Sequence, residues 1–367
     1  MAGILIIGGY GHVGRQIAQH LAQDGRAGVR IGGRDAGRSA AVAGQLGCEW
    51  VTIDLNDSQS WDHALAGIET VIVCLDVATD EFPAHVLKKG LAYIDISATD
   101  DVLRRIEALD ALARAHDGRA VLSVGLAPGL SNLMARTAAA ELEHIEALTI
   151  GVLLGLGSTH GPAALNWTLD NLEPLTRGAV QMLRFGPEAK PVATMPFDFA
   201  DQHVLARRQG LSPVVTRLGL DSPLITKGSL QLLSRLASKA WFRRLLHWSM
   251  TRFQLGSDRA SLVVAAKGQN AGDSIHRRLT LDGRDEAAIT ALIAANVALM
   301  LPGSVGPGVW HIDEVWQLSD FAPTLMRAGV ALSVPGPGGC DGRSGPPQKH
   351  RPLGARWAPK SHPHTHP

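Results

Sequence analysis

The segment Gly3–Gly14 reads GILIIGGYGHVG and decides the fold. The four consecutive aliphatic residues Ile4–Ile7 are typical of a parallel strand that is covered on both faces. Gly9, Gly11 and Gly14 then fit the pattern G-x-G-x-x-G, which permits a tight turn, a close approach of backbone to a pyrophosphate, and close packing of helix on strand. Strand, glycine turn and helix in this order predict a dinucleotide-binding βα unit.

The first third of the chain continues this alternation of strands and helices. After the glycine turn, Val13, Ile17 and Leu21 recur every four residues, which is the apolar stripe of an amphipathic helix. Further apolar runs occupy residues 29–31, 51–53, 71–75, 93–96 and 121–124. Regular alternation of this kind predicts an α/β fold with a doubly wound, Rossmann-type parallel sheet.

The pattern changes after residues 125–129, which read GLAPG, and longer mixed segments follow. They predict a second, α+β domain with a mixed sheet, which includes a hairpin around residues 267–272. Its strands are expected at residues 148–154, 214–220, 262–266 and 275–281, and its helices at about 163–183 and 230–248. The near-neutral helix 287–301 has no polar face and is expected to be buried against the first domain.

Length and composition limit the class of protein. At roughly 150 residues per domain, 367 residues correspond to about two domains. We expect an NAD(P)-binding domain at 1–130 with a return segment at about 287–330, a substrate and dimerisation domain at 131–286, and a disordered tail at 335–367. Proline and glycine make up 14 of the 33 tail residues, a composition that cannot bury enough apolar surface to offset its ordering entropy.

Charge and cysteine content exclude several functions. The 35 basic and 34 acidic side chains give a net charge of +1, which is no basis for binding nucleic acid. Three cysteines cannot form a disulfide framework or a cysteine-rich zinc site, so no metal is expected. The N-terminus has no basic region before its apolar strand, and the longest apolar stretch is too short to span a membrane. We therefore expect a cytoplasmic protein.

The end of the second strand indicates which dinucleotide binds. An NAD enzyme usually carries Asp or Glu about 20 residues beyond the glycine motif, where the carboxylate holds the ribose 2′-hydroxyl. This chain has Arg34 there, followed by Asp35, with Arg38 one helical turn later. Paired hydrogen bonds from a guanidinium suit a 2′-phosphate, which favours NADP(H) over NAD. The alternative is that Arg34 is a solvated charge and Asp35 holds the ribose.

The cofactor-binding residues expected from these patterns are Gly9, Tyr10, Gly11, His12, Val13, Gly14, Arg34, Arg38, Asp54 and Leu75. Asp54 ends the third strand, where its carboxylate could accept from the adenine amino group or cap a turn. Leu75 ends the fourth strand, at the rim where cofactor and substrate usually meet.

The chain resembles the saccharopine dehydrogenase-like family over about residues 3–327, most strongly in its N-terminal half. The resemblance is carried by residues 8–14, 33–35, 93–97, 125–132 and 306–311, which read GGYGHVG, GRD, YIDIS, GLAPGLSN and GPGVWH. It implies a Rossmann domain, a second domain for substrate and a C-terminal return to the first domain. It also implies reduction of an imine, or oxidation of a secondary amine, with NADP(H) or NAD(H).

The chain lacks the residues that two other dehydrogenase mechanisms require. The short-chain type needs a Tyr followed four residues later by Lys, and neither Tyr10 nor Tyr93 has that neighbour. A zinc-dependent type needs Cys and His ligands, and neither Cys48 nor Cys74 has a suitably spaced partner. Imine reduction requires less, because a protonated C=N group already accepts hydride and one acid or base suffices.

His160 and Asp201 are the candidates for that acid or base. His160 lies in a loop, STHGP, that could place it at a helix N-terminus, or it could simply hydrogen-bond its surroundings. Asp201 belongs to the cluster FDFADQH, which could bind an ammonium group, although a helix cap is favoured because Asp is common before a helix.

The sequence thus predicts an NADP(H)-dependent oxidoreductase that acts on a C–N or C–O bond of a small metabolite and forms a homodimer. The alternative is a dinucleotide-binding sensor that catalyses nothing. A basic, aromatic segment at residues 235–248 could lie on a membrane surface, but packing of its aromatic face within the substrate domain is the favoured interpretation.

Overall fold

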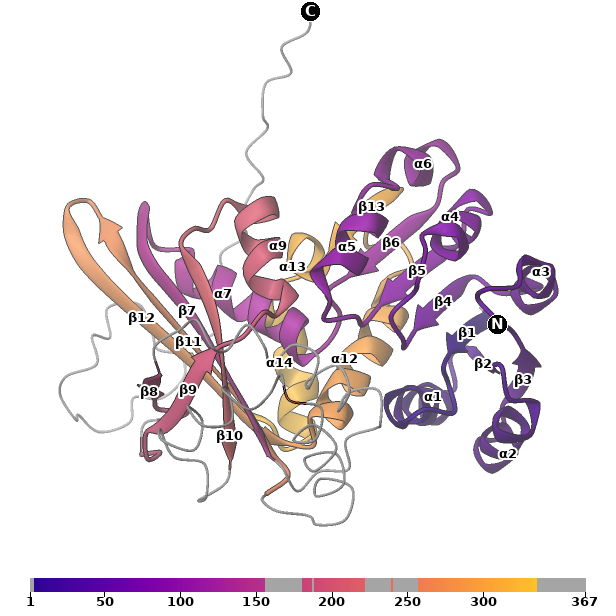
Figure 1. The fold of residues 1–367 in the computed structure, drawn as a ribbon, viewed down its shortest axis with the longest axis horizontal. Coiled ribbons are helices and arrows are strands. Elements are labelled where there is room, and N and C mark those ends of the chain that lie inside the picture. Colours follow the sequence, from indigo (N-terminus) through magenta and orange to yellow (C-terminus); the bar gives the residue numbers. More distant parts are fainter. Residues whose placement is uncertain (1–2, 156–179, 187, 222–238, 240–256, 335–367) are drawn as a thin grey trace, which may run out of the picture.

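A computed structural model describes residues 3–155, 180–186, 188–221, 239 and 257–334. These residues form two seven-stranded sheets, A and B, with helices between them (Figure 1). Sheet A is parallel throughout, and sheet B mixes parallel and antiparallel pairs. The predicted α/β fold, a doubly wound sheet with a second mixed-sheet domain, is therefore confirmed.

Sheet A has the strand order β13-β6-β5-β4-β1-β2-β3. Its strands are β1 (Gly3–Ile7), β2 (Gly28–Gly33), β3 (Glu49–Thr52), β4 (Thr70–Val73), β5 (Ala92–Asp95), β6 (Arg119–Leu122) and β13 (Gly308–His311). Its connections carry α1 (His12–Asp24), α2 (Ala36–Leu46), α3 (Trp61–Leu65), α4 (Glu81–Lys88), α5 (Asp100–Glu107) and α6 (Asp110–Ala115), with a short 3₁₀ turn η1 (Ser58–Ser60). β2 and β3 lie on one side of β1, and β4, β5 and β6 follow on its other side. The direction in which strands are added to the sheet therefore reverses beside β1, where such folds bind ligands.

Both faces of sheet A are buried, which explains its uninterrupted aliphatic strands. Along β1, Ile4 and Ile6 join one core cluster, while Leu5 and Ile7 join the cluster on the opposite face. This alternation follows from the two-residue period of a strand. The first cluster continues through the helices between the sheets to the inner face of sheet B, so both sheets share one core.

Sheet B has the strand order β14-β12-β11-β7-β10-β9-β8. Its strands are β7 (His144–Gly155), β8 (Gln181–Leu183), β9 (Val192–Pro196), β10 (Val214–Asp221), β11 (Arg259–Asn270), β12 (Asp273–Arg284) and β14 (Ala331–Ser333). The predicted hairpin is confirmed, since β11 and β12 pair along their whole length around the turn Ala271–Gly272. Both turn residues have positive φ, which the preferred two-residue hairpin turns require.

The prediction of a helix at about residues 163–183 is wrong at its C-terminal end. Residues 181–183, expected in a helix, form the edge strand β8, because pairing with β9 provides backbone hydrogen bonds that override the helical pattern. Most of that helix, like most of the one expected at 230–248, lies outside the described residues, as does the tail 335–367.

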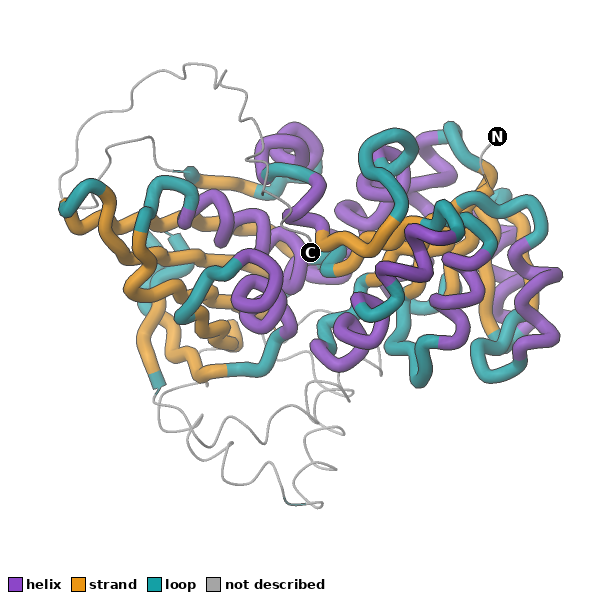
Figure 2. The backbone as a smooth tube through the Cα atoms, turned by 90° about the horizontal axis from the view of Figure 1, so that it is seen from above, coloured by secondary structure: helices purple, strands orange, loops and turns teal. Residues whose placement is uncertain are grey.

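The helices between the sheets are α7 (Ser131–Ala139), α9 (Ala200–Gln209), α12 (Glu286–Met300), α13 (Ile312–Val315) and α14 (Leu318–Arg327). The turn η2 (Leu126–Leu130) leads into α7. Figures 1 and 2 show these helices joining the two layers, with α7 against sheet B and α12 against α1. The apolar helix predicted at 287–301 is therefore buried between the layers. Within the described ranges, no helix has the length and apolar character needed to cross a membrane.

We expect Gly14→Ala to destabilise the protein by about 1–3 kcal/mol, the usual range for overpacking. The added Cβ would lie 2.4 Å from the Gly8 carbonyl oxygen and 2.8 Å from the Gly9 Cα, both of which are backbone atoms. Gly44→Ala is the matched control, because its Cβ meets nothing within 4 Å on the surface of α2 and alanine favours a helix. Urea unfolding of both variants checks this, and equal stability of Gly14→Ala and wild type would contradict it.

Candidate functional site

The glycine turn after β1 is held against β2 by backbone hydrogen bonds. The N–H groups of Gly8 and Gly9 donate to the Gly32 carbonyl at 2.9 and 3.3 Å, and Gly8 takes a positive φ of 75° that favours glycine. Gly11 is the N-cap residue of α1 and offers no side chain to the first-turn N–H groups. The first turn also has no acidic residue, so the positive end of the helix dipole is not compensated locally.

A cavity of about 380 Å³ opens beside this turn, at the carboxyl ends of β1 to β4. Five sequence-predicted residues line it: Tyr10, Gly11, Arg34, Asp54 and Leu75. It is completed by Ile7, Gly8, Gly33, Ile53, Leu55, Asn56, Cys74, Asp76, Val77 and Ala78. The remaining predicted cofactor residues, Gly9, His12, Val13, Gly14 and Arg38, do not line it. They lie in the glycine turn, in the first turn of α1 and in α2.

Aromatic stacking shapes the β2 end of this cavity. The Tyr10 ring packs over Gly33, where a Cβ would lie only 2.2 Å from a ring carbon. The Arg38 guanidinium lies 4.4 Å from the centre of the same ring, a cation–π distance. Asp35 is the N-cap of α2, and its Oδ1 accepts from the backbone N–H of Arg38 at 2.9 Å. The Asp54 side chain stabilises the turn after β3, because its Oδ1 accepts from the backbone N–H of Asn56 at 3.0 Å.

Polar side chains meet where β4 and β5 end, at the rim where the sequence predicts that cofactor and substrate meet. The Ser97 hydroxyl donates to Asp76 Oδ1 at 2.6 Å, and the Thr99 hydroxyl donates to Asp76 Oδ2 at 2.8 Å. Behind them Asp95 is fully buried and accepts from the Ser97 N–H and the Tyr93 hydroxyl, each at 2.7 Å. Burial raises the pKa of Asp95 to about 7, and the nearby Asp76 charge acts in the same direction.

Asp201 lies away from this cavity, in the first turn of α9, and is not the cap residue of that helix. It is fully buried, and its Oδ1 accepts from the Thr216 hydroxyl at 2.6 Å and from the Gln202 N–H at 2.7 Å. Burial raises its pKa. The contact with Thr216 attaches α9 to β10. His160, the other candidate acid or base, lies outside the described residues.

A chain of polar groups joins the β6–β13 edge of sheet A to helix α9. His311 at the end of β13 is fully buried, with Nδ1 2.8 Å from the Ser123 hydroxyl and Nε2 3.0 Å from Glu107 Oε1. Arg207 of α9 donates to both oxygens of Glu107, at 2.7 and 3.0 Å. Burial alone would raise the pKa of Glu107, but hydrogen bonds from His311 and Arg207 lower it to about 2. This network fixes α9 against α5 and β13.

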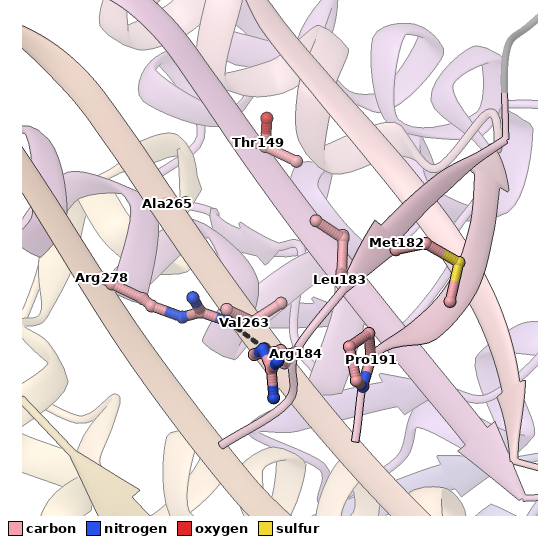
Figure 3. Close-up of a pocket in the computed structure, with 8 residues that line it drawn as sticks. All are labelled: Thr149, Met182, Leu183, Arg184, Pro191, Val263, Ala265 and Arg278. Atoms are coloured by element: carbon pink, nitrogen blue, oxygen red, sulfur yellow. Dashed lines mark hydrogen bonds between the residues drawn. The ribbon is translucent and has the colours of Figure 1, made fainter. Parts of the chain in front are cut away.

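A second cavity, of about 280 Å³, lies on the face of sheet B opposite α7 (Figure 3). It is lined by Thr149, Met182, Leu183, Arg184, Pro191, Val263, Ala265 and Arg278. The Arg278 guanidinium donates to the Arg184 carbonyl. None of its lining residues is shared with the cavity at the glycine turn, and none is an acid, His, Cys or Tyr. The cavity at the glycine turn is therefore the candidate site.

We expect the stability of the wild type to fall relative to Asp95→Asn as pH rises from about 4 to about 8. The pKa of Asp95 is raised from its ordinary value of 3.8, so the folded protein holds this proton more tightly than the unfolded chain does. The protonated Asp95 side chain makes its full contribution to the free energy of unfolding below about pH 4. This contribution, roughly 2–4 kcal/mol, is lost progressively as the pH rises to about 7. Urea unfolding at several pH values measures the difference, with exposed Asp80→Asn as the control for lost charge. A difference that is constant with pH would refute this expectation.

Comparison with known proteins agrees with this geometry. A family model described as NAD(P)H-binding matches residues 8–127, which run from the glycine turn through β2 to β6 and end within η2. No curated protein sequence matches the chain.

A solved structure shares the fold over most of the chain. Saccharopine dehydrogenase (L-Glu forming) from Saccharomyces cerevisiae superposes with a TM-score of 0.62 at 14% identity, over 91% of this chain and 99% of that chain. C. glutamicum DAP dehydrogenase, in complex with DAP, gives a TM-score of 0.49 at 18% identity, over 88% of this chain and 98% of that chain. The chain therefore has a saccharopine dehydrogenase-like fold whose first domain matches an NAD(P)H-binding family.

Proposed function

We propose that the chain is an NADP(H)-dependent oxidoreductase that acts on a C–N bond, or a C–O bond, of a small metabolite. The observation that carries the proposal is the cavity at the glycine turn. Its lining includes Arg34 at the β2 end, which has no hydrogen-bond or ion-pair partner among the described residues, and Asp76 after β4, which accepts from Ser97 and Thr99. The fold that the chain shares with saccharopine dehydrogenase, a dehydrogenase by name, supports the class of reaction.

The residues at the turn fit the pyrophosphate of a dinucleotide. Gly11 would bring a Cβ within 3.0 Å of the Gly8 oxygen, so the turn is as tight as the motif requires. The α1 N-terminus, capped by glycine and without an acidic side chain, leaves its first N–H groups for an anion. Gly11, His12, Val13 and Gly14 would hold the phosphates through these groups.

Two arginines support NADP(H) rather than NAD(H). Arg34 lines the cavity and is exposed, and Arg38 is exposed beside it. Among the described residues, neither guanidinium forms an ion pair or donates a hydrogen bond. Asp35, which would hold the ribose hydroxyl of NAD(H), already accepts the Arg38 N–H as the α2 cap. A 2′-phosphate beside Arg34 would therefore meet a guanidinium that has no ion-pair partner among the described residues, and Arg38, which stacks on the Tyr10 ring, would add a second positive charge from α2.

Hydride transfer requires few further side chains from the protein. The nicotinamide cofactor, when bound, supplies or accepts the hydride. The protein has to place the substrate carbon beside the nicotinamide, exclude water and provide for one proton. Asp76, Ser97 and Thr99 are the described polar side chains at that end of the site.

We expect Arg34→Ala to weaken NADPH binding by roughly 10- to 100-fold, because it removes charge-assisted hydrogen bonds to the 2′-phosphate. NADH, which lacks that phosphate, should lose less than threefold (about 0.6 kcal/mol). Quenching of protein fluorescence measures both dissociation constants, and exposed Arg104→Ala on α5 is the matched control. Equal losses for NADPH and NADH would refute the assignment of NADP(H).

Turnover separates the enzyme from a non-catalytic sensor. A panel of amines with NADP⁺ and of imines with NADPH, followed at the nicotinamide absorbance, should show oxidation or reduction of at least one member. Tight, NADPH-selective binding without turnover on any member would favour the sensor.

A further inference from the structure

We propose that the cavity on sheet B binds a small carboxylate with an apolar body, and that Arg184 and Arg278 hold its charged end. This inference does not depend on the proposed function, because the cavity shares no lining residue with the cavity at the glycine turn. The family match at residues 8–127 ends before sheet B begins. The protein would therefore hold a second ligand, at a site separate from that of the dinucleotide.

The floor of this cavity is one row of residues across three neighbouring strands. Thr149 of β7, Ala265 of β11 and Arg278 of β12 are partners in the strand register. The adjacent residues Leu148 and Val264 belong to the core between the two sheets, so the row faces the opposite, outer side of sheet B. Ala265 has the smallest side chain of the row, which leaves a hollow between Thr149 and Arg278.

The chain that follows β8 crosses the outer face and forms a wall of the cavity. The crossing is close at Gly151 of β7, where a Cβ would lie 2.9 Å from the Leu183 side chain and 3.2 Å from the Phe185 ring. Leu183 and Phe185 pack with Val263 in a small apolar cluster on this face. Arg184 lies between them in sequence, is exposed and lines the cavity. Its backbone is therefore anchored on both sides above the floor that carries Arg278.

Two positive charges meet in this cavity, and no acid lines it. The Arg278 guanidinium donates to the Arg184 carbonyl (Figure 3), and Arg184 Nη1 donates to the Ala189 carbonyl at 3.0 Å. Both acceptors are neutral, and neither arginine has an ion-pair partner in the ranges that the structure describes. A guanidinium has five N–H donors, so each arginine keeps most of its donors for a ligand. An anion in the cavity would compensate both charges.

The rest of the lining indicates what the anion is attached to. Apart from Thr149 it is apolar and consists of Met182, Leu183, Pro191, Val263 and Ala265, and Met182 is 52% exposed. A carboxylate presents two oxygens that match the planar fork of a guanidinium, and an apolar body would cover these side chains. The volume of about 280 Å³ lies near the lower end of the range for small-molecule sites, about 300–1,000 Å³, which favours a short carboxylate.

The test compares probes that differ in charge or in apolar body. Wild-type protein is titrated with 4-methylpentanoate, with its neutral amide 4-methylpentanamide and with acetate, and saturation-transfer NMR measures each dissociation constant. We expect 4-methylpentanoate to bind roughly tenfold or more tightly than the amide, because only the carboxylate forms charge-assisted hydrogen bonds. It should also bind roughly tenfold or more tightly than acetate, which lacks the apolar body. Saturation with NADPH should change its affinity by less than about twofold.

Substitution of Arg278 tests the charged end. Arg278→Gln should weaken binding of 4-methylpentanoate by roughly 10- to 100-fold and change binding of the amide by less than about twofold. Arg278→Lys keeps the charge without the paired donors and should restore part of the affinity. The matched control is Arg284→Gln, because Arg284 lies on the same strand, is exposed and does not line the cavity. It should bind all three probes as wild type does.

Ala265→Leu tests the hollow without changing any charge. The larger side chain would occupy the space between Thr149 and Arg278, and we expect the affinity for 4-methylpentanoate to fall by roughly tenfold or more. Circular dichroism and urea unfolding of each variant show that it is folded.

Four results would overturn the inference. They are equal binding of the carboxylate and the amide by wild type, unchanged affinity in Arg278→Gln, absence of carboxylate binding, and displacement of the carboxylate by NADPH. Displacement would place the carboxylate in the cavity at the glycine turn. If wild type binds no carboxylate and sediments as a dimer, while Arg278→Gln sediments as a monomer, the arginines contact a second copy of the chain instead.

Discussion

The contact between Gly14 of α1 and the backbone of the turn at Gly8 and Gly9 is the constraint on which the site depends. A Cβ on Gly14 would lie inside van der Waals distance of both neighbours, so only glycine lets α1 begin this close to β1. The close contact directs the first-turn N–H groups of α1 toward the ends of the strands. The turn is fixed from the other side by hydrogen bonds from Gly8 and Gly9 to β2. The cavity therefore has a rigid wall of backbone, and the side chains of neighbouring strands need only complete it.

A shared apolar core and a network of polar side chains hold the second layer in place beside that wall. The apolar helix α12 packs on α1, and α7 packs on β7, β11 and β12, so apolar contacts continue from one sheet to the other. The chain from Ser123 through His311 and Glu107 to Arg207 then fixes α9 laterally. At the start of α9, the Ala200 N–H donates to the Ala98 carbonyl at 3.2 Å, between Ser97 and Thr99. The segment that carries Ser97 and Thr99, whose hydroxyls donate to Asp76, is thus attached to α9.

Local patterns were sufficient to predict most of the fold. The aliphatic runs of β1, β4 and β5 and the glycine motif required no knowledge of distant residues, because burial on both faces leaves few alternatives. The edge strand β8 was not predictable in this way, since its structure comes from pairing with β9. The sequence offered Asp35 as an alternative ribose ligand, and the structure adds that its side chain caps α2.

The site was less accessible to sequence reasoning than the fold. Asp76 and Thr99 are separated by 23 residues and meet only because β4 and β5 are neighbours. A usable signal existed, because polar residues follow both strands and the carboxyl ends of adjacent parallel strands lie at the same edge. Asp201 shows the opposite case. Its position in the cluster FDFADQH suggested ammonium binding or capping, but its hydroxyl partner is Thr216 on β10, which no local pattern indicates.

Hydrogen exchange of the wild-type chain with and without NADPH tests the central claim most directly, because it reports both binding and its location. The account predicts slower exchange in peptides that cover residues 8–14, 33–38 and 74–78, with no change in the edge strands of sheet B at residues 181–183 and 192–196. Absence of protection at residues 8–14, or protection confined to sheet B, would contradict a dinucleotide site at the glycine turn.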